Sequence, residues 1–209
     1  QPNLRVATQY FISTEPLVAI ECAIGMGRYW LWRGQYAEAR DVIESALAAQ
    51  KRIGEMPPEL ETKARYFAGG HCYMMSELAA AGEHYQLAVN AGRLANDDAG
   101  AGAAMCGLAM VVYVQHGHAA SQKLYEDGIA LLLRGGDRRT AAYNICNLAN
   151  TAAYADEMDT AEHCLAQLEA LSAELAEPMV EARLASSRGQ NCLHRGQYDE
   201  SAKWFRRNL

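Results

Sequence analysis

Residues 27–46 read GRYWLWRGQYAEARDVIESA, and this stretch decides the fold. An apolar segment that begins at the small residue Gly27 ends in a tight turn at Gly34, and a second apolar segment follows from Tyr36. The same order of small residue, turn and apolar segment starts again at Gly69, Ala109, Ala149 and Gly189. The successive starts are 42, 40, 40 and 40 residues apart. The pattern therefore predicts a repeated pair of antiparallel helices, with small residues where the two helices of a pair cross closely.

The composition agrees with a chain built only from helices. Half of the 209 residues are hydrophobic and 21% are charged, which excludes a disordered chain and is enough for a sizeable core. Ala and Leu, two of the best helix formers, are abundant, and only 5 Pro interrupt the chain. We therefore expect an all-α fold.

Local start and stop signals divide the chain into ten expected helices. Thr14-Glu15-Pro16, Pro57-Pro58, Asp97-Asp98 and Glu177-Pro178 are typical of helix beginnings, and Gly135-Gly136-Asp137 is typical of an end followed by a new N-cap. The helices are predicted at about 15–33, 36–53, 58–80, 82–95, 98–115, 118–134, 137–155, 158–175, 177–195 and 198–208.

These helices form five expected repeat units. We place them at about 15–57, 58–97, 98–136, 137–176 and 177–209. Residues 1–14 are expected to be an N-terminal segment, the tail of a preceding repeat. Because no polar capping helix is evident at either end, we expect the sequence to be part of a longer array.

With Gly34, Tyr36, Ala39 and Ala46, and again with Gly196 and Tyr198, the chain resembles a tetratricopeptide-repeat (TPR) protein. That resemblance implies a right-handed α-α superhelix, a TPR-like solenoid, of about five helical hairpins. The period exceeds the usual 34 residues of that family. Ser76 stands in place of a turn glycine, and Gly128 and Asn208 stand in place of late alanines.

The longer repeat is similar to that of bacterial LuxR-type ATPase transcription regulators. Gly136-Asp137-Arg138 and Asn147-Leu148-Ala149 match sequence motifs of those repeat arrays. Animal scaffold proteins with forty-residue repeats share the same features. The resemblance thus implies the fold more strongly than the function.

In such arrays the first helix of each pair lines a concave groove. Tyr, Asn, Arg and Met dominate the residues expected there, and these side chains suit contact with a peptide, a protein segment or a small effector. The resemblance also implies that Asn147 and Asn150 bind the backbone of a bound peptide. The alternative is that several of the tyrosines only cover neighbouring helices. The expected groove residues are Arg28, Trp32, Tyr66, Tyr73, Met110, Tyr113, Tyr143, Asn147, Asn150, Tyr154, Arg183, Gln190 and His194.

Charge and cysteine usage limit the partners and the compartment. The formal charge of −6 and the absence of a basic stripe argue against nucleic acid as a direct partner. The uncharged run 99–114 is short for a bilayer, so we expect a buried helix and no membrane contact. The six cysteines lack a C-x-x-C motif and are read as free thiols of a cytoplasmic protein, although Cys106 and Cys146 hold equivalent places in successive units.

No residue pattern predicts catalysis, a metal or a cofactor. The chain has no phosphate-binding loop, nucleophile elbow or zinc-protease motif. His116-Gly117-His118 is interpreted as a plain loop. His163 and Cys164 are adjacent on one helix, so their side chains point about 100° apart and do not form a dyad.

The sequence therefore predicts a non-catalytic binding domain. We expect the sensor or interaction part of a cytoplasmic bacterial transcription regulator. The alternative is a scaffold or self-association module of a signalling protein, dimerising through exposed end helices that carry Trp204 and Phe205.

Overall fold

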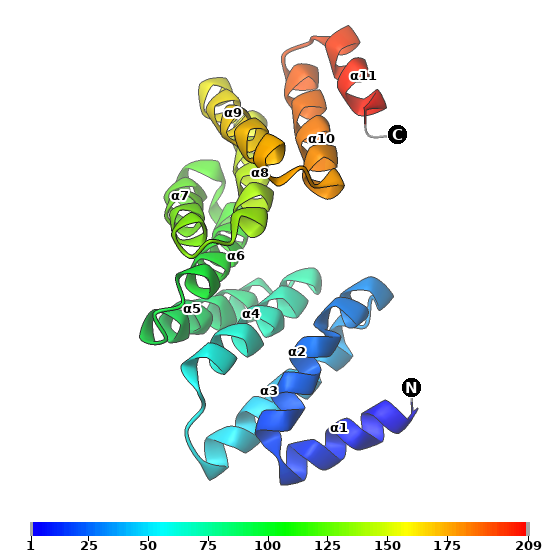
Figure 1. Ribbon diagram of the computed structural model, residues 1–209, viewed down its shortest axis with the longest axis vertical. Helices are drawn as coiled ribbons and strands as arrows, with labels where there is room; N and C mark the ends of the chain where they lie inside the picture. The colour runs from blue at the N-terminus through cyan, green and yellow to red at the C-terminus, as the bar shows by residue number, and fades with distance from the viewer. Residues whose placement is uncertain (1, 208–209) are drawn as a thin grey trace. The chain divides into compact units, whose positions relative to one another are not determined.

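The computed structural model describes residues 2–207, with side chains from residue 6 onward, and every regular element in that part is an α-helix. The chain divides into two compact units, Gln1–Val111 and Val112–Leu209, and α6 runs across the boundary. Figure 1 shows the helices of each unit arranged as successive hairpins. In chain order the helices are α1 (Pro2–Thr14), α2 (Pro16–Arg33), α3 (Tyr36–Ile53), α4 (Pro58–Met74), α5 (Leu78–Leu94), α6 (Asp98–His116), α7 (His118–Arg134), α8 (Arg138–Tyr154), α9 (Met158–Leu175), α10 (Pro178–His194) and α11 (Tyr198–Arg206).

In the second repeat, the predicted end of the first helix and the predicted start of the second helix are wrong. We expected helices at 58–80 and 82–95, but α4 ends at Met74 and α5 begins at Leu78. Ser76, with φ of 62°, makes the turn between them. The apolar residues after the turn continue the helical pattern without a glycine, so the sequence signal for the break is weak.

The helices near the two ends of the chain also differ in part from the prediction. Thr14 does not cap α2, because its hydroxyl donates to the carbonyl of Tyr10 within α1. Residues 2–14 form α1, which packs on α2 and α3. The last predicted helix, 198–208, is found to Arg206; Asn208 lies outside the described residues.

A left-handed residue makes the turn within each of the five hairpins. These residues are Gly34, Ser76, Gly117, Asp156 and Gly196, with φ between 61° and 84°. The left-handed backbone costs a side-chain-bearing residue about 1 kcal/mol or more, which explains why glycine holds three of the five places. The repeat read from the sequence is thus present in the backbone.

In the first unit, small residues permit close helix crossings. A Cβ on Gly69 would lie 3.0 Å from the Tyr85 ring, where α4 crosses α5 within one hairpin, as predicted. Gly27 has a different role from the one expected, because a Cβ there would lie 2.7 Å from Phe67 of α4, in the next hairpin. The core around these crossings contains Ile20, Trp30, Ile43 and several alanines.

The part of α6 that belongs to the first unit packs closely against α5. A Cβ on Gly92 would lie 2.9 Å from the backbone of Ala101, and one on Gly107 would overlap Tyr85. Among the described residues, α6 is also the one helix that is long and apolar enough to cross a membrane. Of the 18-residue apolar stretch in this helix, 44% is buried. Its small residues serve close packing against α5.

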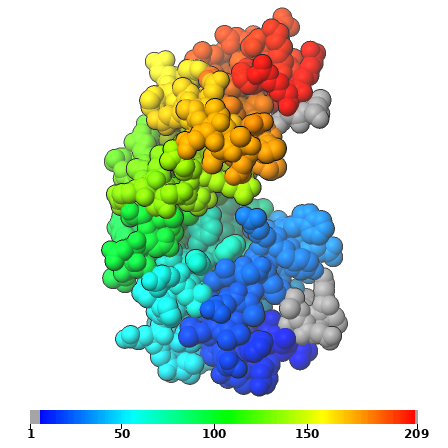
Figure 2. Space-filling view, viewed as in Figure 1, coloured from blue at the N-terminus to red at the C-terminus, as the bar shows by residue number. Residues whose placement is uncertain are grey.

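The second unit packs its helices around α8. Helix α8 contacts α7, α9 and α10, and α10 contacts α11. The Ser201 hydroxyl donates to the Gly189 carbonyl over 2.8 Å, and Phe205 packs on Gly189. The space-filling view shows α10 and α11, in orange and red, as one continuous surface (Figure 2).

Candidate functional site

Seven of the predicted groove residues share one surface of the second unit, here called the α8–α10 face. On α8 they recur at helical spacing, and α10 packs beside α8. Every one of them is partly or fully exposed. The α8–α10 face consists of Tyr143, Asn147, Asn150, Tyr154, Arg183, Gln190 and His194.

One end of the face is an aromatic ring covered by cations. The guanidinium of Arg183 lies 4.4 Å from the centre of the Tyr143 ring, and that of Arg139 lies 5.9 Å away. Arg139 Nε also donates to the Tyr143 hydroxyl over 3.2 Å and pairs with Glu177 at 2.9 Å. Among the described residues Arg183 has no carboxylate partner, so its positive charge is available at the surface.

The middle of the face presents two asparagine amides. Asn147 Nδ2 donates weakly to Asn144 Oδ1 over 3.5 Å, and Asn150 Nδ2 lies 3.7 Å from Cys146 Sγ. Both contacts are long and remain within α8, so most of the bonding capacity of each amide is unused. These two amides can therefore bind an incoming polar backbone.

The other end is a second aromatic cluster. The rings of Tyr154 and His194 meet edge to face with centroids 4.9 Å apart. Gln190 Nε2 donates to the Tyr154 hydroxyl, which ties α10 to α8. Tyr154 is nevertheless 55% exposed, so its ring is held in place and still accessible.

The predicted residues of the first unit do not share this arrangement. Tyr66 and Tyr73 pack against the core formed by Cys72, Ala81, Tyr85 and Val111, which favours the alternative that these tyrosines cover neighbouring helices. Arg28 and Trp32 are exposed on α2, and the Trp32 side chain is 82% exposed.

The two groove residues on α6 are both partly buried. Met110 belongs to the first unit and Tyr113 to the second.

Two cavities were missed by the sequence reasoning. In the second unit α7, α8 and α9 line a partly open cavity of about 600 Å³, with Ile129, Leu133, Leu148 and Leu171 on its walls. Its α8 residues point away from the α8–α10 face, as their positions around the helix require. In the first unit α1, α2 and α3 line one of about 450 Å³. Apolar positions at helix spacing look the same in sequence whether they are fully packed or line a hollow, so no signal distinguished them.

The histidine turn is not the plain loop that we expected. His118 is the first residue of α7 and is buried, with Nδ1 3.1 Å from Thr151 Oγ1 and Nε2 3.4 Å from Glu157 Oε2. His116 is exposed at the end of α6. His118 contacts residues of α8 and of the turn before α9, which lie 33 or more residues away in the sequence. The residues around Gly117 therefore contain no sequence pattern that could predict these contacts.

The buried thiols of Cys106 and Cys164 are poor nucleophiles. All six cysteines are free, and all but Cys22 are buried. Burial raises the pKa of Cys106 to about 12 and that of Cys164 to about 11. Cys164 is buried and its neighbour His163 is exposed, and both line the cavity between α7, α8 and α9.

No family model matches the chain, and no curated protein matches it either. Solved structures do resemble it. BtubC from P. vanneervenii superposes with a TM-score of 0.77 at 14% identity, over 98% of this chain and 85% of that one. Aspartyl phosphate phosphatase F from Bacillus subtilis gives 0.75 at 10% identity, over 98% of this chain and 63% of that one.

A kinesin light chain protein of Podosopora anserina, with nearly identical TPR-like repeats, gives a TM-score of 0.69 at 15% identity. The match covers 93% of this chain and 95% of that one. At these identities the likeness concerns the fold, and it confirms the predicted all-α, TPR-like helical repeat.

Proposed function

We propose that the chain is a non-catalytic repeat domain that binds a peptide or protein segment on the α8–α10 face. The observation that carries this proposal is the order of groups along the face: a cation-covered Tyr143, two under-used amides, and the exposed Tyr154–His194 pair. Ordered aromatic rings offer contact area at low entropic cost, and amides satisfy the polar backbone of an extended ligand.

The dimensions and charge of the face define the ligand more closely. Tyr143 and Tyr154 are three helical turns apart, about 16 Å, which is the length of about five extended residues. Arg183 offers an unpaired positive charge at one end. The favoured ligand is therefore a short extended segment with an acidic side chain that lies next to Arg183.

The thiol chemistry supports a role without turnover. A nucleophilic cysteine needs a lowered pKa and access for the substrate. Cys106 and Cys164 have raised pKa values and are buried, and Cys146 shares a contact of 2.9 Å with Ser187 in the interior.

A randomised peptide library screened against the chain tests the proposal. We expect enrichment of short peptides with Asp or Glu at one end. In fluorescence polarisation the double variant Asn147→Ala/Asn150→Ala and the single variant Arg183→Gln should each lose about tenfold or more in affinity, because a central contact contributes more than about 1 kcal/mol. The affinity of Tyr113→Ala for the peptide, measured in the same way, shows whether α6 contributes to binding.

Tyr198→Ala is the matched control, because Tyr198 is an exposed tyrosine on α11 outside the face. Circular dichroism should show unchanged helicity in every variant. Undiminished binding by the asparagine double variant and by Arg183→Gln would place the site elsewhere.

The proposal extends to the larger protein. The sequence motifs Gly136-Asp137-Arg138 and Asn147-Leu148-Ala149 support the proposal that the chain is a domain of a cytoplasmic bacterial transcription regulator. The complete reading frame tests this extension: a nucleotide-binding domain together with a helix-turn-helix supports it, and an unrelated architecture contradicts it.

A scaffold that self-associates is the second candidate. Leu193 of α10 and Phe205 of α11 are 48% and 40% exposed, and both lie near the end of the second unit. Analytical ultracentrifugation of the chain and of a Leu193→Ser/Phe205→Ser variant distinguishes the two. A concentration-dependent dimer that the variant abolishes would favour the scaffold.

A further inference from the structure

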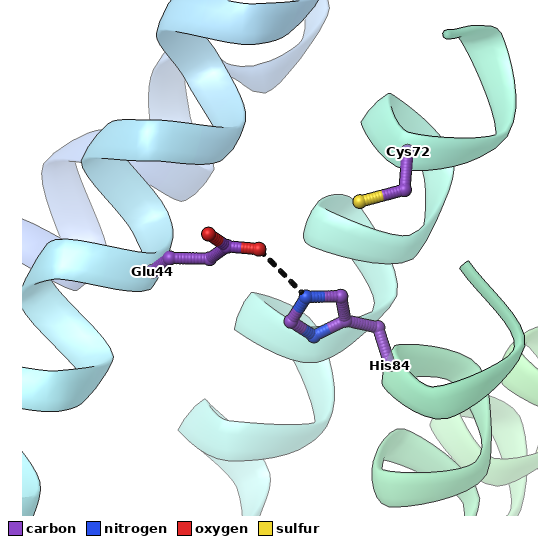
Figure 3. A group of neighbouring side chains, drawn as sticks. All are labelled: Glu44, Cys72 and His84. Atoms are coloured by element: carbon purple, nitrogen blue, oxygen red, sulfur yellow. Dashed lines mark hydrogen bonds and ion pairs between the residues drawn. The ribbon is translucent and has the colours of Figure 1, made fainter. Parts of the chain in front are cut away.

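Three potential metal ligands meet inside the first unit, away from the α8–α10 face. They are Glu44 of α3, Cys72 of α4 and His84 of α5, and Figure 3 shows their side chains pointing toward one another. One ligand atom from each lies within 4.8 Å of the other two, and Glu44 Oε1 lies 3.1 Å from His84 Nε2. Cys72 and His84 follow Glu44 at spacings that match no metal motif, so only packing brings them together.

The burial of the three side chains suits an ion. Cys72 is fully buried and His84 nearly so, whereas the Glu44 side chain is 44% exposed. Two ligands therefore lie in the interior, and the third is a partly exposed carboxylate. The exposed side of Glu44 leaves a route by which an ion and a water molecule can reach the site.

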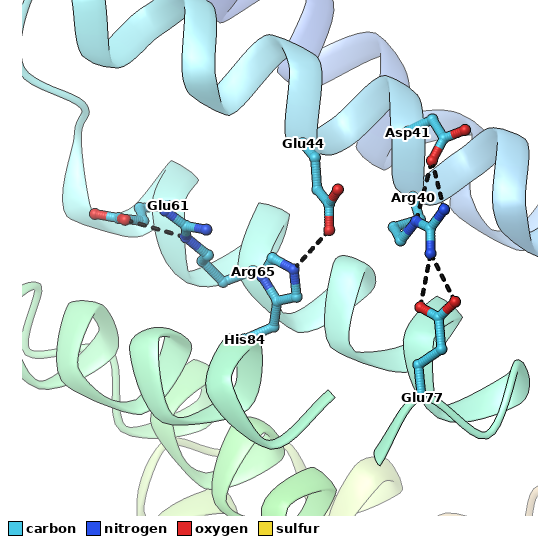
Figure 4. Close-up of polar contacts among 7 residues, drawn as sticks. All are labelled: Arg40, Asp41, Glu44, Glu61, Arg65, Glu77 and His84. Carbon is cyan, nitrogen blue, oxygen red and sulfur yellow. Dashed lines mark hydrogen bonds and ion pairs between the residues drawn. The ribbon is translucent and has the colours of Figure 1, made fainter. Parts of the chain in front are cut away.

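The charges around the cluster favour a cation. Arg40 is the nearby guanidinium, and it is held by both carboxylate oxygens of Glu77, at 2.8 and 2.6 Å, and by Asp41. Figure 4 shows this pairing on one side of the Glu44–His84 contact and the Arg65–Glu61 pair on the other. Carboxylates outnumber guanidinium groups in this neighbourhood, so a bound cation would relieve their mutual repulsion.

We propose that Glu44, Cys72 and His84 bind one Zn²⁺ ion, with water in the fourth position. Thiolate, imidazole and carboxylate are the three side-chain ligands that zinc accepts, at about 2.0–2.3 Å. Tetrahedral ligands at that range are about 3.3–3.7 Å apart. The Glu44–His84 contact, at 3.1 Å, is slightly shorter than this spacing. A small outward shift of the Glu44 carboxylate and a closure of about 1 Å by Cys72 Sγ would bring all three ligands to it.

The same three residue types could form a cysteine nucleophile with its base, but the geometry favours the metal. Cys72 is inaccessible to a substrate, and burial, together with the carboxylates of Glu44 and Glu77, raises the pKa of its thiol to about 11. Metal binding displaces the thiol proton to solvent, so the affinity for Zn²⁺ rises with pH. The bound ion would join α3, α4 and α5 and stabilise the first unit against unfolding.

Isothermal titration calorimetry with Zn²⁺ tests the site, in a Cys22→Ser background that removes the exposed thiol. We expect one ion per chain, proton release that depends on buffer, and a higher unfolding temperature with Zn²⁺. Co²⁺ in place of Zn²⁺ should produce a sulfur-to-cobalt charge-transfer band in the near ultraviolet. Cys72→Ser should abolish that band, and Glu44→Gln, a change at a half-exposed position, should lower the affinity at least about tenfold.

Cys106→Ser is the matched control, because Cys106 is an equally buried thiol of the first unit outside the cluster. It should bind Zn²⁺ like the background protein. The absence of stoichiometric binding, or equal binding by Cys72→Ser and the background, would overturn the proposal and leave Glu44–His84 as a structural ion pair.

Discussion

His71 in the first unit and His118 in the second are both buried, at 1% and 4% exposure, but their surroundings differ. His71 lies between the rings of Trp30 and Tyr36, each 6.4 Å away, and neither ring nitrogen has a partner among the described residues. The Thr151 hydroxyl donates to the Leu148 carbonyl, so it accepts from His118 Nδ1. The same residue type is thus held by aromatic packing in one unit and by hydrogen bonding in the other.

Other contacts of the two units differ in a similar way. Aromatic rings fill close crossings in the first unit, as Tyr85 does against Gly69. The second unit joins its helices with polar contacts, such as Arg188 to Glu162 and Glu169 and Cys146 to Ser187. At these positions we therefore expect the first unit to respond to lost volume and to acid, and the second unit to lost hydrogen bonds.

The largest effect is expected from Tyr85→Ala. Tyr85 is 3% exposed and its ring fills the space above Gly69 and Gly107, so truncation leaves a cavity. The free energy of unfolding should fall by about 3–5 kcal/mol. Urea denaturation followed by circular dichroism measures it. Tyr198→Ala, at an exposed tyrosine, should change stability by less than about 0.5 kcal/mol; a similar loss in both variants would contradict the packing role.

Acid should destabilise the first unit through His71. Burial without a partner lowers the pKa of His71 to about 4, from 6.5. Between those values the unfolded chain binds the proton and the folded chain does not, so stability falls as pH drops from about 6.5 to about 4. The full loss is about 3 kcal/mol.

His71→Leu removes the titrating group and should flatten this part of the stability profile. Urea midpoints at pH 7.5, 6, 5 and 4 measure the effect. His194→Gln, at an exposed histidine, is the control and should retain the slope of the parent. An unchanged slope in His71→Leu would assign the acid sensitivity to other groups.

Thr151→Val tests the polar contacts of the second unit. It leaves His118 Nδ1 without an acceptor in the interior, which should cost about 1–3 kcal/mol. Thr62→Val is the counterpart in the first unit, because the buried Thr62 hydroxyl donates only to the Pro58 carbonyl of its own helix. Its cost should be smaller. Thermal melts measure the stability of both variants. An equal loss of stability in Thr151→Val and Thr62→Val would contradict the proposed difference between the two units.

The smallest effect concerns the turns. Gly34 and Ser76 both adopt left-handed backbone, with φ of 68° and 62°. Gly34→Ala should lower stability by about 1 kcal/mol, and Ser76→Gly should raise it by up to about 1 kcal/mol. Thermal melts measure both changes. A loss of stability in Ser76→Gly would show that its side chain contributes more than its strained backbone costs.

Most of the helix assignment was predictable because its signals are local. Pro58 and Pro178 begin helices as predicted, and Asp137 accepts from the Thr140 amide as an N-cap. The helix boundary at Ser76 was missed, although the repeat alignment placed Ser76 where a turn glycine is expected, because the apolar residues after it continue the helical pattern. The helix-face spacing also indicated which side chains of α8 share a surface, from Tyr143 to Tyr154.

The sequence by itself determined the repeat, its period and the all-helical hairpins, because hydrophobic spacing, turn glycines and caps act over a few residues along the chain. Only the tertiary structure decided which partners each side chain has: Tyr143 with Arg183, His118 with Thr151, and Cys72 with Glu44 and His84. These contacts join separate helices and depend on how the helices pack, and a period of forty residues does not specify that packing.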